Sequence, residues 1–176
     1  MTAERAFRIE RADITDYQMF ADIIQTVWNA LDKKEWFVAD NAEYTYEMLQ
    51  SGRGMGYKAV DSNTGMTAGV FMAVIPGISR ENLGRDAGMG DQELSLVAHM
   101  DSVAILPEYR GYKLQYRLMQ TAEGDLREKG FRYLLCTVHP DNRYSRDNIV
   151  SQGYKSVAVK EKYGGYMREI FLKRIG

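Results

Sequence analysis

The 176-residue sequence has a single cysteine, two histidines and no long apolar segment. Cys136 on its own excludes a disulfide within the chain, and its apolar surroundings predict a reduced, buried thiol. No run reaches the ~18 apolar residues of a membrane-spanning helix. The N-terminal stretch MTAERAFRIERAD also lacks the apolar core of a signal peptide. We therefore expect a cytoplasmic protein that does not bind membranes.

Neither sign of charge dominates the sequence. It has 23 basic and 24 acidic residues and a net charge of −1, which gives no general attraction to nucleic acid. Binding to RNA through a basic patch is therefore disfavoured. The hydrophobic content of 45% and the charged content of 27% are typical of a globular protein. The length predicts one domain over residues 1–176.

Hydrophobic periodicity and turn residues predict the order of helices and strands. Thr15 and Gln18 have the spacing of a capping box before the first helix, and Asp40 with Glu43 is expected to open the second. Residues 76–92, with four glycines and many charges, are predicted to form a long functional loop. The predicted strands are 7–12, 57–60, 67–75, 94–106, 133–138, 155–160 and 167–173, and the predicted helices are 15–31, 40–52, 112–129 and 142–152.

This order, β-α-α-β-β-β-α-β-α-β-β, predicts an α/β (α+β) fold. The strand–helix–strand unit from 94 to 138 should be right-handed, with its two strands parallel. Neighbours joined by tight turns should be antiparallel. We therefore expect one mixed, mostly antiparallel sheet of six to seven strands, flanked by about four helices.

The stretch LPEYRGYKLQ, residues 106–115, reads as a strand end, a tight turn and a helix start. Such a turn points backbone N–H groups at an anion. Loops of this kind are usually rich in glycine, because glycine lets the backbone approach a phosphate closely. This one has only Gly111, with Lys113 and Gln115 where further small residues would be expected. Arg110 and Lys113 could also be no more than solvated turn residues.

Three features together resemble the GNAT superfamily of acetyl-CoA-dependent N-acetyltransferases. The element order matches over nearly the whole chain. Residues 103–111, VAILPEYRG, are similar to the family's fourth strand and its pyrophosphate loop, Arg/Gln-x-x-Gly-x-Gly/Ala. Asn142-x-x-Ser145, followed by Gly153-Tyr154, resembles the family's Asn-x-x-Ala…Gly-Phe helix. The resemblance implies that the parallel strands 94–106 and 133–138 splay apart around acetyl-CoA.

The resemblance also implies a set of residues that bind the cofactor. Main-chain N–H groups and the helix dipole hold the phosphates, so the cradle can keep Lys113 and Gln115 at its glycine positions, with Lys113 as an added charge. For Asn142 and Ser145 the alternative is local helix capping. The expected cofactor-binding residues are Val103, Ala104, Ile105, Arg110, Gly111, Tyr112, Lys113, Leu114, Gln115, Asn142 and Ser145.

Two histidines are candidates for the general base. His99 and Asp101 share one face of a strand, so His99 could accept a proton, directly or through water, with Asp101 orienting it. Some relatives of the arylalkylamine type carry histidine on this strand. The alternative is a structural histidine bonded across the sheet. His139 is a second candidate, or a turn cap. A zinc site of His99, His139 and Asp101 is not required by their spacing, so no metal is expected.

The general acid is left open. Many relatives carry a tyrosine seven residues after the helix asparagine, which protonates the leaving thiolate, but this chain has Ile149 there. Tyr144 is close in sequence, on another face of the helix, and is a candidate catalytic residue, with packing at the helix start as the alternative. Tyr163, Tyr166 and Arg168, in the last hairpin, could grip an acceptor that bears a carboxylate or an aromatic ring.

The sequence thus predicts an N-acetyltransferase that moves an acetyl group from acetyl-CoA to a primary amine of a small molecule or peptide. Its partners would be a CoA thioester and an amine acceptor. The alternative is an acyl-CoA-binding sensor or regulatory module that has lost turnover, which Ile149 makes conceivable. The acceptor's identity and a homodimeric state stay open.

Overall fold

The computed structural model describes residues 4–176, so the first three residues of the N-terminal stretch lie outside it. The chain divides into two compact units. The first consists of the chain up to Leu31 together with residues 39–73 and 102–122, and the second consists of residues 32–38, 74–101 and 123–176. The strand β4, Val97–Ile105, contributes residues to both units.

The strands have the hydrogen-bonded order β1-β2-β3-β4-β5-β7-β6. Besides β4, they are β1 Phe7–Arg11, β2 Gly54–Asp61, β3 Thr67–Val74, β5 Tyr133–Val138, β6 Lys155–Lys162 and β7 Tyr166–Arg174. β4 and β5 are parallel, whereas the pairs β1–β2, β5–β7 and β6–β7 are antiparallel. The predicted mixed sheet, its strand number and its parallel pair are confirmed.

The helices follow the predicted order with one addition. They are α1 Tyr17–Ala30, α2 Ala42–Ser51, α3 Asp91–Leu94, α4 Leu114–Glu128 and α5 Arg143–Ser151. The 3-10 helices found within residues 4–176 are η1 Ile14–Asp16, η2 Lys34–Trp36, η3 Leu83–Arg85 and η4 Pro107–Tyr109. The addition is α3, whose Leu94 is buried, so β4 begins at Val97 rather than at the predicted residue 94.

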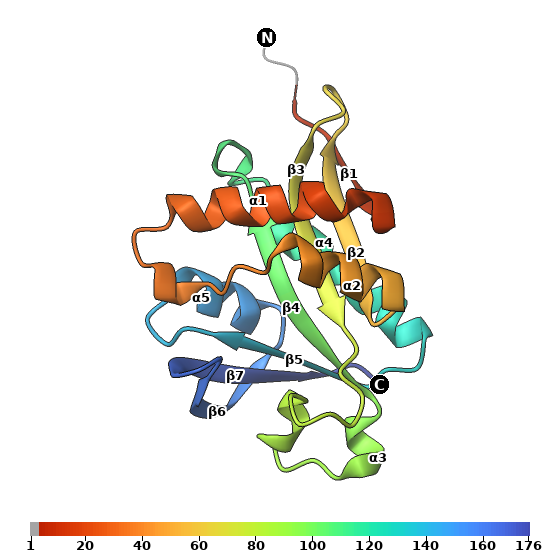
Figure 1. The fold of residues 1–176 in the computed structure, drawn as a ribbon, viewed down its shortest axis with the longest axis vertical. Helices are drawn as coiled ribbons and strands as arrows, with labels where there is room; N and C mark the ends of the chain where they lie inside the picture. The colour runs from red at the N-terminus through yellow and green to blue at the C-terminus, as the bar shows by residue number, and fades with distance from the viewer. Residues whose placement is uncertain (1–3) are drawn as a thin grey trace. The chain divides into compact units, whose positions relative to one another are not determined.

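In the first unit, α1 and α2 lie side by side in front of β2 (Figure 1). β2 carries glycine where these helices approach it. A Cβ atom added to Gly56 would lie 3.1 Å from the side chain of Leu49 and 3.3 Å from that of Phe20. Phe20 is fully buried. Because Gly56 has no side chain, both helices can pack closely on β2 at this position.

The starts of α1 and α2 correct two sequence predictions. The capping box uses Asp13 and Asp16 instead of Thr15 and Gln18, because the 3-10 turn η1 places the cap two residues earlier. The cap of α2 is Asn41, whose Oδ1 accepts the N–H of Tyr44 at 2.8 Å. Asp40 is thus not the helix cap.

In the second unit, β7 pairs along the whole of β5, from Tyr133 opposite Arg174 to Val138 opposite Glu169. The parallel pairing of β4 with β5 is much shorter. It covers Val97–His99 against Tyr133–Leu135, although β5 continues to Val138. This short ladder agrees with the predicted splayed pair.

The long segment between β3 and β4 is ordered by one buried amide. Asn82 is 1% exposed, and its Nδ2 donates to the carbonyl oxygens of Gly77, at 2.7 Å, and Leu94, at 3.0 Å. Its Oδ1 accepts the N–H of Gly84 at 2.8 Å. Because one side chain joins the start, middle and end of the segment, the predicted loop has a defined conformation.

We predict that Glu123→Gln destabilises the second unit. The buried Glu123 carboxylate of α4 lies 2.6 Å from Lys173 Nζ and 3.3 Å from Arg127 Nη2. Removing its charge leaves Lys173, which is 19% exposed, without its partner. We expect the free energy of unfolding in urea to fall by about 2 kcal/mol. Glu128→Gln, on the exposed end of the same helix, is the control and should change it little. Equal stabilities of the two variants would contradict the prediction.

Candidate active site

In the first unit, the chain reverses between β4 and α4 through residues 106–113, which we call the β4–α4 turn. Leu106 N–H donates to Ala68 O at 2.9 Å, and η4 follows. Gly111, with φ of 90°, and Lys113, with φ of 58°, then adopt left-handed conformations. An L-residue rarely adopts this conformation, so its appearance at Lys113 marks a position that the turn imposes.

Lys113 occupies the position at which the resemblance expects glycine, and its backbone keeps the conformation that favours glycine. The first bond within α4 runs from Arg117 N–H to Lys113 O at 3.0 Å. The N–H groups of Leu114, Gln115 and Tyr116 precede that bond, so the helix itself provides them with no acceptor. Arg110 and Lys113 are exposed beside them. This arrangement can bind an anion such as a phosphate.

Phe7 of β1 forms an aromatic cluster with two tyrosines of the turn. The ring of Phe7 lies 5.9 Å from that of Tyr109 and 5.1 Å from that of Tyr112. The guanidinium of Arg5 stacks on both tyrosines. Arg117 Nη2 donates to Phe7 O at 3.0 Å, so this side chain ties α4 to β1. The ring of Tyr112 therefore packs against Phe7 of β1, and it is the backbone of Tyr112 that would make the predicted contact with the cofactor.

We predict that Lys113→Gly stabilises the protein while weakening its affinity for acetyl-CoA. Glycine adopts the left-handed conformation without the steric cost, so the free energy of unfolding should rise by up to about 1 kcal/mol. The Kd for acetyl-CoA should rise several-fold, because a cation beside the phosphate-binding amides is lost. Lys129→Gly, where φ is not positive, is the control and should bring no gain in stability. A less stable Lys113→Gly protein would contradict the prediction.

The carboxylate of Asp40, in the segment before α2, lies against the middle of β4. Ser102 Oγ donates to Asp40 Oδ2 at 2.7 Å. Burial raises the pKa of the Asp40 carboxyl, and the hydrogen bond from Ser102 partly offsets this shift. The next residues along the strand are the predicted cofactor-binding residues Val103, Ala104 and Ile105, of which Ala104 is buried. Nothing in the sequence joins positions 40 and 102, because only the fold brings them together.

In the second unit, His99 has a buried partner. Its Nε2 accepts the backbone N–H of Leu83 at 3.0 Å. Burial, and then the positive charge of Lys162, lowers the pKa of His99 to about 4, while Asp86 acts in the opposite direction. The imidazole is thus neutral near pH 7, with this lone pair occupied. The carboxylate that acts on it is Asp86 rather than Asp101. This geometry favours the structural alternative, and His99 as a base stays a prediction.

We predict that His99 makes the protein acid-sensitive. Its pKa is about 4 when folded and 6.5 when unfolded, so its contribution to stability is full above pH 6.5 and is lost as the pH falls toward 4. Between pH 7 and pH 4, the stability advantage of the wild type over His99→Gln should shrink by roughly 3 kcal/mol. Urea unfolding at several pH values measures it. A His139→Gln control should keep the wild-type trend, and an advantage independent of pH would refute the assignment.

Helix α5 carries the remaining predicted residues. Asn142 is its N-cap, with Oδ1 accepting the N–H of Ser145 and Nδ2 donating to Ser145 Oγ, both at 3.3 Å. The capping alternative is therefore realised, while a contact with the cofactor stays a prediction. Tyr144 is 74% exposed, and Ile149 is buried. The structure thus gives Tyr144 no enclosed position for proton transfer.

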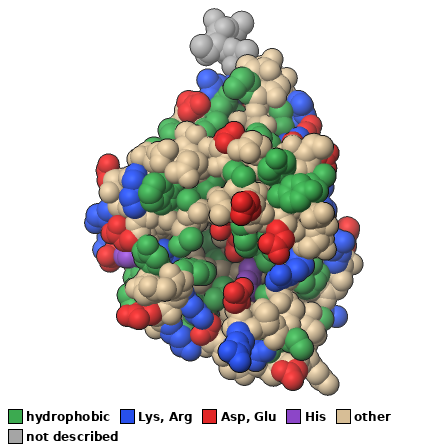
Figure 2. All heavy atoms as spheres, viewed as in Figure 1, with side chains coloured by type: hydrophobic (Ala, Val, Ile, Leu, Met, Phe, Trp, Pro, Cys, Tyr) green, Lys and Arg blue, Asp and Glu red, His purple; other side chains and the backbone are tan. Residues whose placement is uncertain are grey.

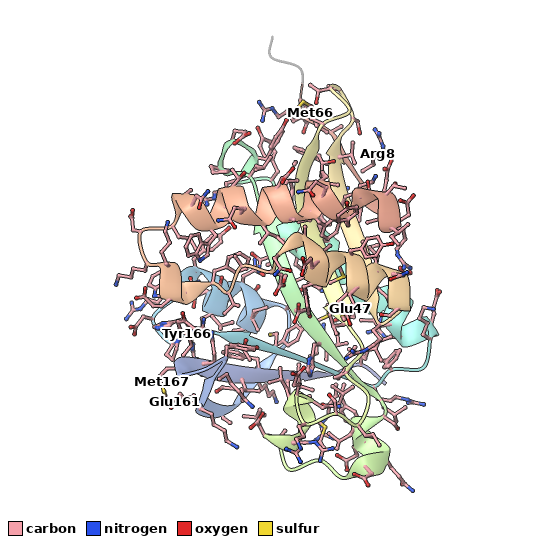
Figure 3. All side chains as sticks on the ribbon, in the orientation of Figure 1. Arg8, Glu47, Met66, Glu161, Tyr166 and Met167 are labelled. Atoms are coloured by element: carbon pink, nitrogen blue, oxygen red, sulfur yellow. The ribbon has the colours of Figure 1, made fainter. Side chains whose placement is uncertain are left out.

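The β6–β7 hairpin projects the side chains of Glu161, Tyr166 and Met167 (Figure 3). Its Tyr163 hydroxyl lies 3.0 Å from Thr137 Oγ1 on β5. Arg168 is buried; it donates to the carbonyl oxygen of Glu35 at 2.7 Å. Its guanidinium lies over the rings of Tyr163 and Tyr166. Arg168 thus braces the hairpin against η2.

His139 has the turn-capping contact that was its alternative. Its Nδ1 accepts the backbone N–H of Asp141 at 3.1 Å, and its ring packs against Trp36.

Within residues 4–176, no three His, Cys, Asp or Glu side chains gather in a way that could hold a metal ion. No helix in the same range is long and apolar enough to cross a membrane. On the face in Figure 2, basic and acidic side chains are interspersed.

Comparisons with known proteins agree with this architecture. A proposed acetyltransferase from Acinetobacter baylyi ADP1 is 13% identical with a TM-score of 0.75, and the match covers 99% of this chain and 95% of that one. A GNAT-family acetyltransferase from Streptococcus pneumoniae is 15% identical, with a TM-score of 0.72 and coverages of 97% and 100%. The ribosomal-protein-S18-alanine N-acetyltransferase of Escherichia coli is 15% identical, with a TM-score of 0.71 and coverages of 97% and 94%.

A comparison with curated protein sequences finds no significant match. The profile described as the Acetyltransferase (GNAT) family matches residues 14–154, which is most of the chain. These residues include the β4–α4 turn and the cap of α5. The chain therefore belongs to the GNAT family of acetyltransferases and is an acyltransferase.

Proposed function

We propose that this protein transfers an acetyl group from acetyl-CoA to a primary amine of a small molecule or peptide. The observation that carries the proposal is the β4–α4 turn. Its left-handed residues Gly111 and Lys113 lead directly into the first N–H groups of α4, for which the helix itself provides no acceptor. GNAT acetyltransferases generally use acetyl-CoA, and this turn has the chemistry that its pyrophosphate requires.

In this proposal each part of the turn has a task. The N–H groups of residues 114–116 bind the pyrophosphate, and Arg110 and Lys113 add positive charge where solvent reaches it. The backbone of Val103–Ile105 holds the arm that ends in the thioester. An amine nitrogen attacks the thioester carbonyl, and the sulfur leaves with the electron pair of the C–S bond.

The acceptor is proposed only as a class. Structurally similar proteins are described as acting on different amines, among them the alanine of a ribosomal protein and phosphinothricin. Their likeness supports amine acetylation and does not choose among these acceptors. The coverage of 94–100% of the relatives described above also supports one acetyltransferase domain over residues 1–176.

A sensor that binds acyl-CoA without turnover is the second candidate. Two observations favour it. Ile149 is buried at the position where many relatives carry the tyrosine that protonates the thiolate, and Tyr144 is exposed. The two functions differ in whether CoA is released as a free thiol. A sensor would bind acetyl-CoA and release none when amines are added.

The test measures thiol release from acetyl-CoA with a panel of amino acids, arylalkylamines, polyamines and peptides with free N-termini. Amine-dependent release supports the enzyme. Tight acetyl-CoA binding without release by any amine supports the sensor. Absence of both binding and release refutes the two proposals together.

We predict that Gly111→Pro weakens acetyl-CoA binding more than tenfold. Proline fixes φ near −65°, which is incompatible with the φ of 90° at Gly111, and it lacks an N–H donor. Calorimetry gives the Kd. Gly65→Pro is the matched control, because Gly65 is also left-handed, with φ of 75°, but lies in the β2–β3 hairpin. It should lose stability and keep its affinity. A folded Gly111→Pro protein with unchanged affinity would exclude the turn as the binding site.

A further inference from the structure

We propose that Asp40 binds the ammonium group of the acceptor and takes its proton before the attack on the thioester. This inference rests on the proposed function and adds the acidic residue that makes the amine reactive. It assigns a cationic amine as the form of the acceptor that the protein first recognises. An amine is largely protonated at neutral pH and is nucleophilic only after losing that proton.

The backbone around Asp40 is fixed. The following residue, Asn41, caps α2 through its bond to Tyr44 N–H, so the chain enters the helix in one conformation. The carboxylate of Asp40 is then held by Ser102 at 2.7 Å. A catalytic group needs such support from neighbouring bonds, because a small displacement reduces its effect.

One oxygen of Asp40 is left for a ligand. Ser102 occupies Oδ2, whereas no hydrogen bond or ion pair from any residue in 4–176 reaches Oδ1. Oδ1 is not among the buried side-chain atoms without a partner, so solvent reaches it. No Lys, Arg or His of the same range forms an ion pair with this carboxylate. A half-buried carboxylate with no cation of its own is suited to an incoming ammonium group.

The position along β4 suits the reaction. Ser102 lies two and three residues before Ala104 and Ile105, which corresponds to roughly 7–10 Å at ~3.3 Å per residue. An amine held at Asp40 can bridge this distance, directly or through one water. His99 lies five and six residues before Ala104 and Ile105 in the sequence, and its Nε2 already accepts a backbone N–H.

Burial prepares Asp40 for this task. It raises the carboxyl pKa, which makes the group a better proton acceptor than a solvated aspartate. The hydrogen bond from Ser102 stabilises the ionised form and keeps it available.

The proton balance of the step is complete. A proton moves from R–NH3⁺ to the Asp40 carboxylate, giving R–NH2 and a carboxylic acid that later returns the proton to water. The nitrogen lone pair forms the C–N bond, and the C–S bond breaks with its electrons on sulfur. The proton lost by the attacking nitrogen passes to the thiolate, so the products are R–NH–CO–CH3 and CoA–SH.

The experiment compares Asp40→Asn with the wild type, using the amine that gives the fastest thiol release. Asparagine keeps an oxygen that can accept from Ser102, so the fold should be retained. We expect kcat/KM for the amine to fall by about 10²–10⁴-fold. The KM for acetyl-CoA should stay within twofold. Asp40→Glu restores a carboxylate and should recover part of the rate, which a purely structural effect would not produce.

Two further variants keep the proposal testable. Glu43→Gln removes a charge from the first turn of α2, where the side chain is exposed, and should leave kcat/KM unchanged. Ser102→Ala keeps the carboxylate but removes its support, and should lower kcat/KM by roughly 3–10-fold. It replaces Asp40→Asn if that variant does not fold.

Each outcome decides the matter. A folded Asp40→Asn enzyme with wild-type kcat/KM overturns this inference and leaves the acetyltransferase proposal intact. An equal loss in Glu43→Gln also overturns it, because the effect would then be a general loss of negative charge. If the wild type releases no thiol with any amine, the proposed function fails and this inference fails with it.

Discussion

The first unit depends on a reversal of the chain that contains two residues with left-handed backbone conformation. Between β4 and α4 the residues Gly111 and Lys113 both adopt positive φ, and the second does so against the preference of its side chain. Such strain persists only where surrounding contacts determine the conformation. Here the contacts are the rings of Phe7 and Tyr109 and the bond from Arg117 to β1. The contacts of Phe7 with the turn and with Arg117 thus help to set the direction of the first amides of α4.

Burial shifts the pKa in opposite directions for His99, which lies on β4, and for Asp40, which accepts a hydrogen bond from Ser102 of β4. It lowers the pKa of His99 and raises that of Asp40, since in both cases it disfavours the charged form. The consequences differ because of their hydrogen bonds. The Nε2 of His99 accepts a hydrogen bond from the backbone N–H of Leu83, whereas only one of the two carboxylate oxygens of Asp40 accepts a hydrogen bond within the described part of the chain. The histidine therefore contributes to structure, and the carboxylate keeps the capacity to act on a ligand.

The sequence was most informative where the signal is local or periodic. The order of elements, the parallel pair and the turn after Ile105 follow from hydrophobic spacing and turn residues. The predicted N-caps of α1 and α2 were wrong, because several polar residues near the start of each helix could act as the cap. At α1, a 3-10 turn also moved the capping box to earlier residues. Asp40 and Ser102 could not be paired in advance, since 62 positions separate them. The partner of His99 was equally hidden, because it is a backbone amide.

The segment between β3 and β4 is attached to the rest of the second unit at several points. Leu83 N–H bonds to His99, and Asp86 bonds to Lys160 at 3.2 Å and to Lys162 at 2.5 Å. Burial raises the pKa of Asp86, but the two lysines outweigh it and hold that pKa below its usual range. A segment held in this way behaves as a fixed wall and not as a lid. Any molecule that contacts it meets a surface ordered during folding, so binding there incurs little of the entropy loss that a mobile loop would impose.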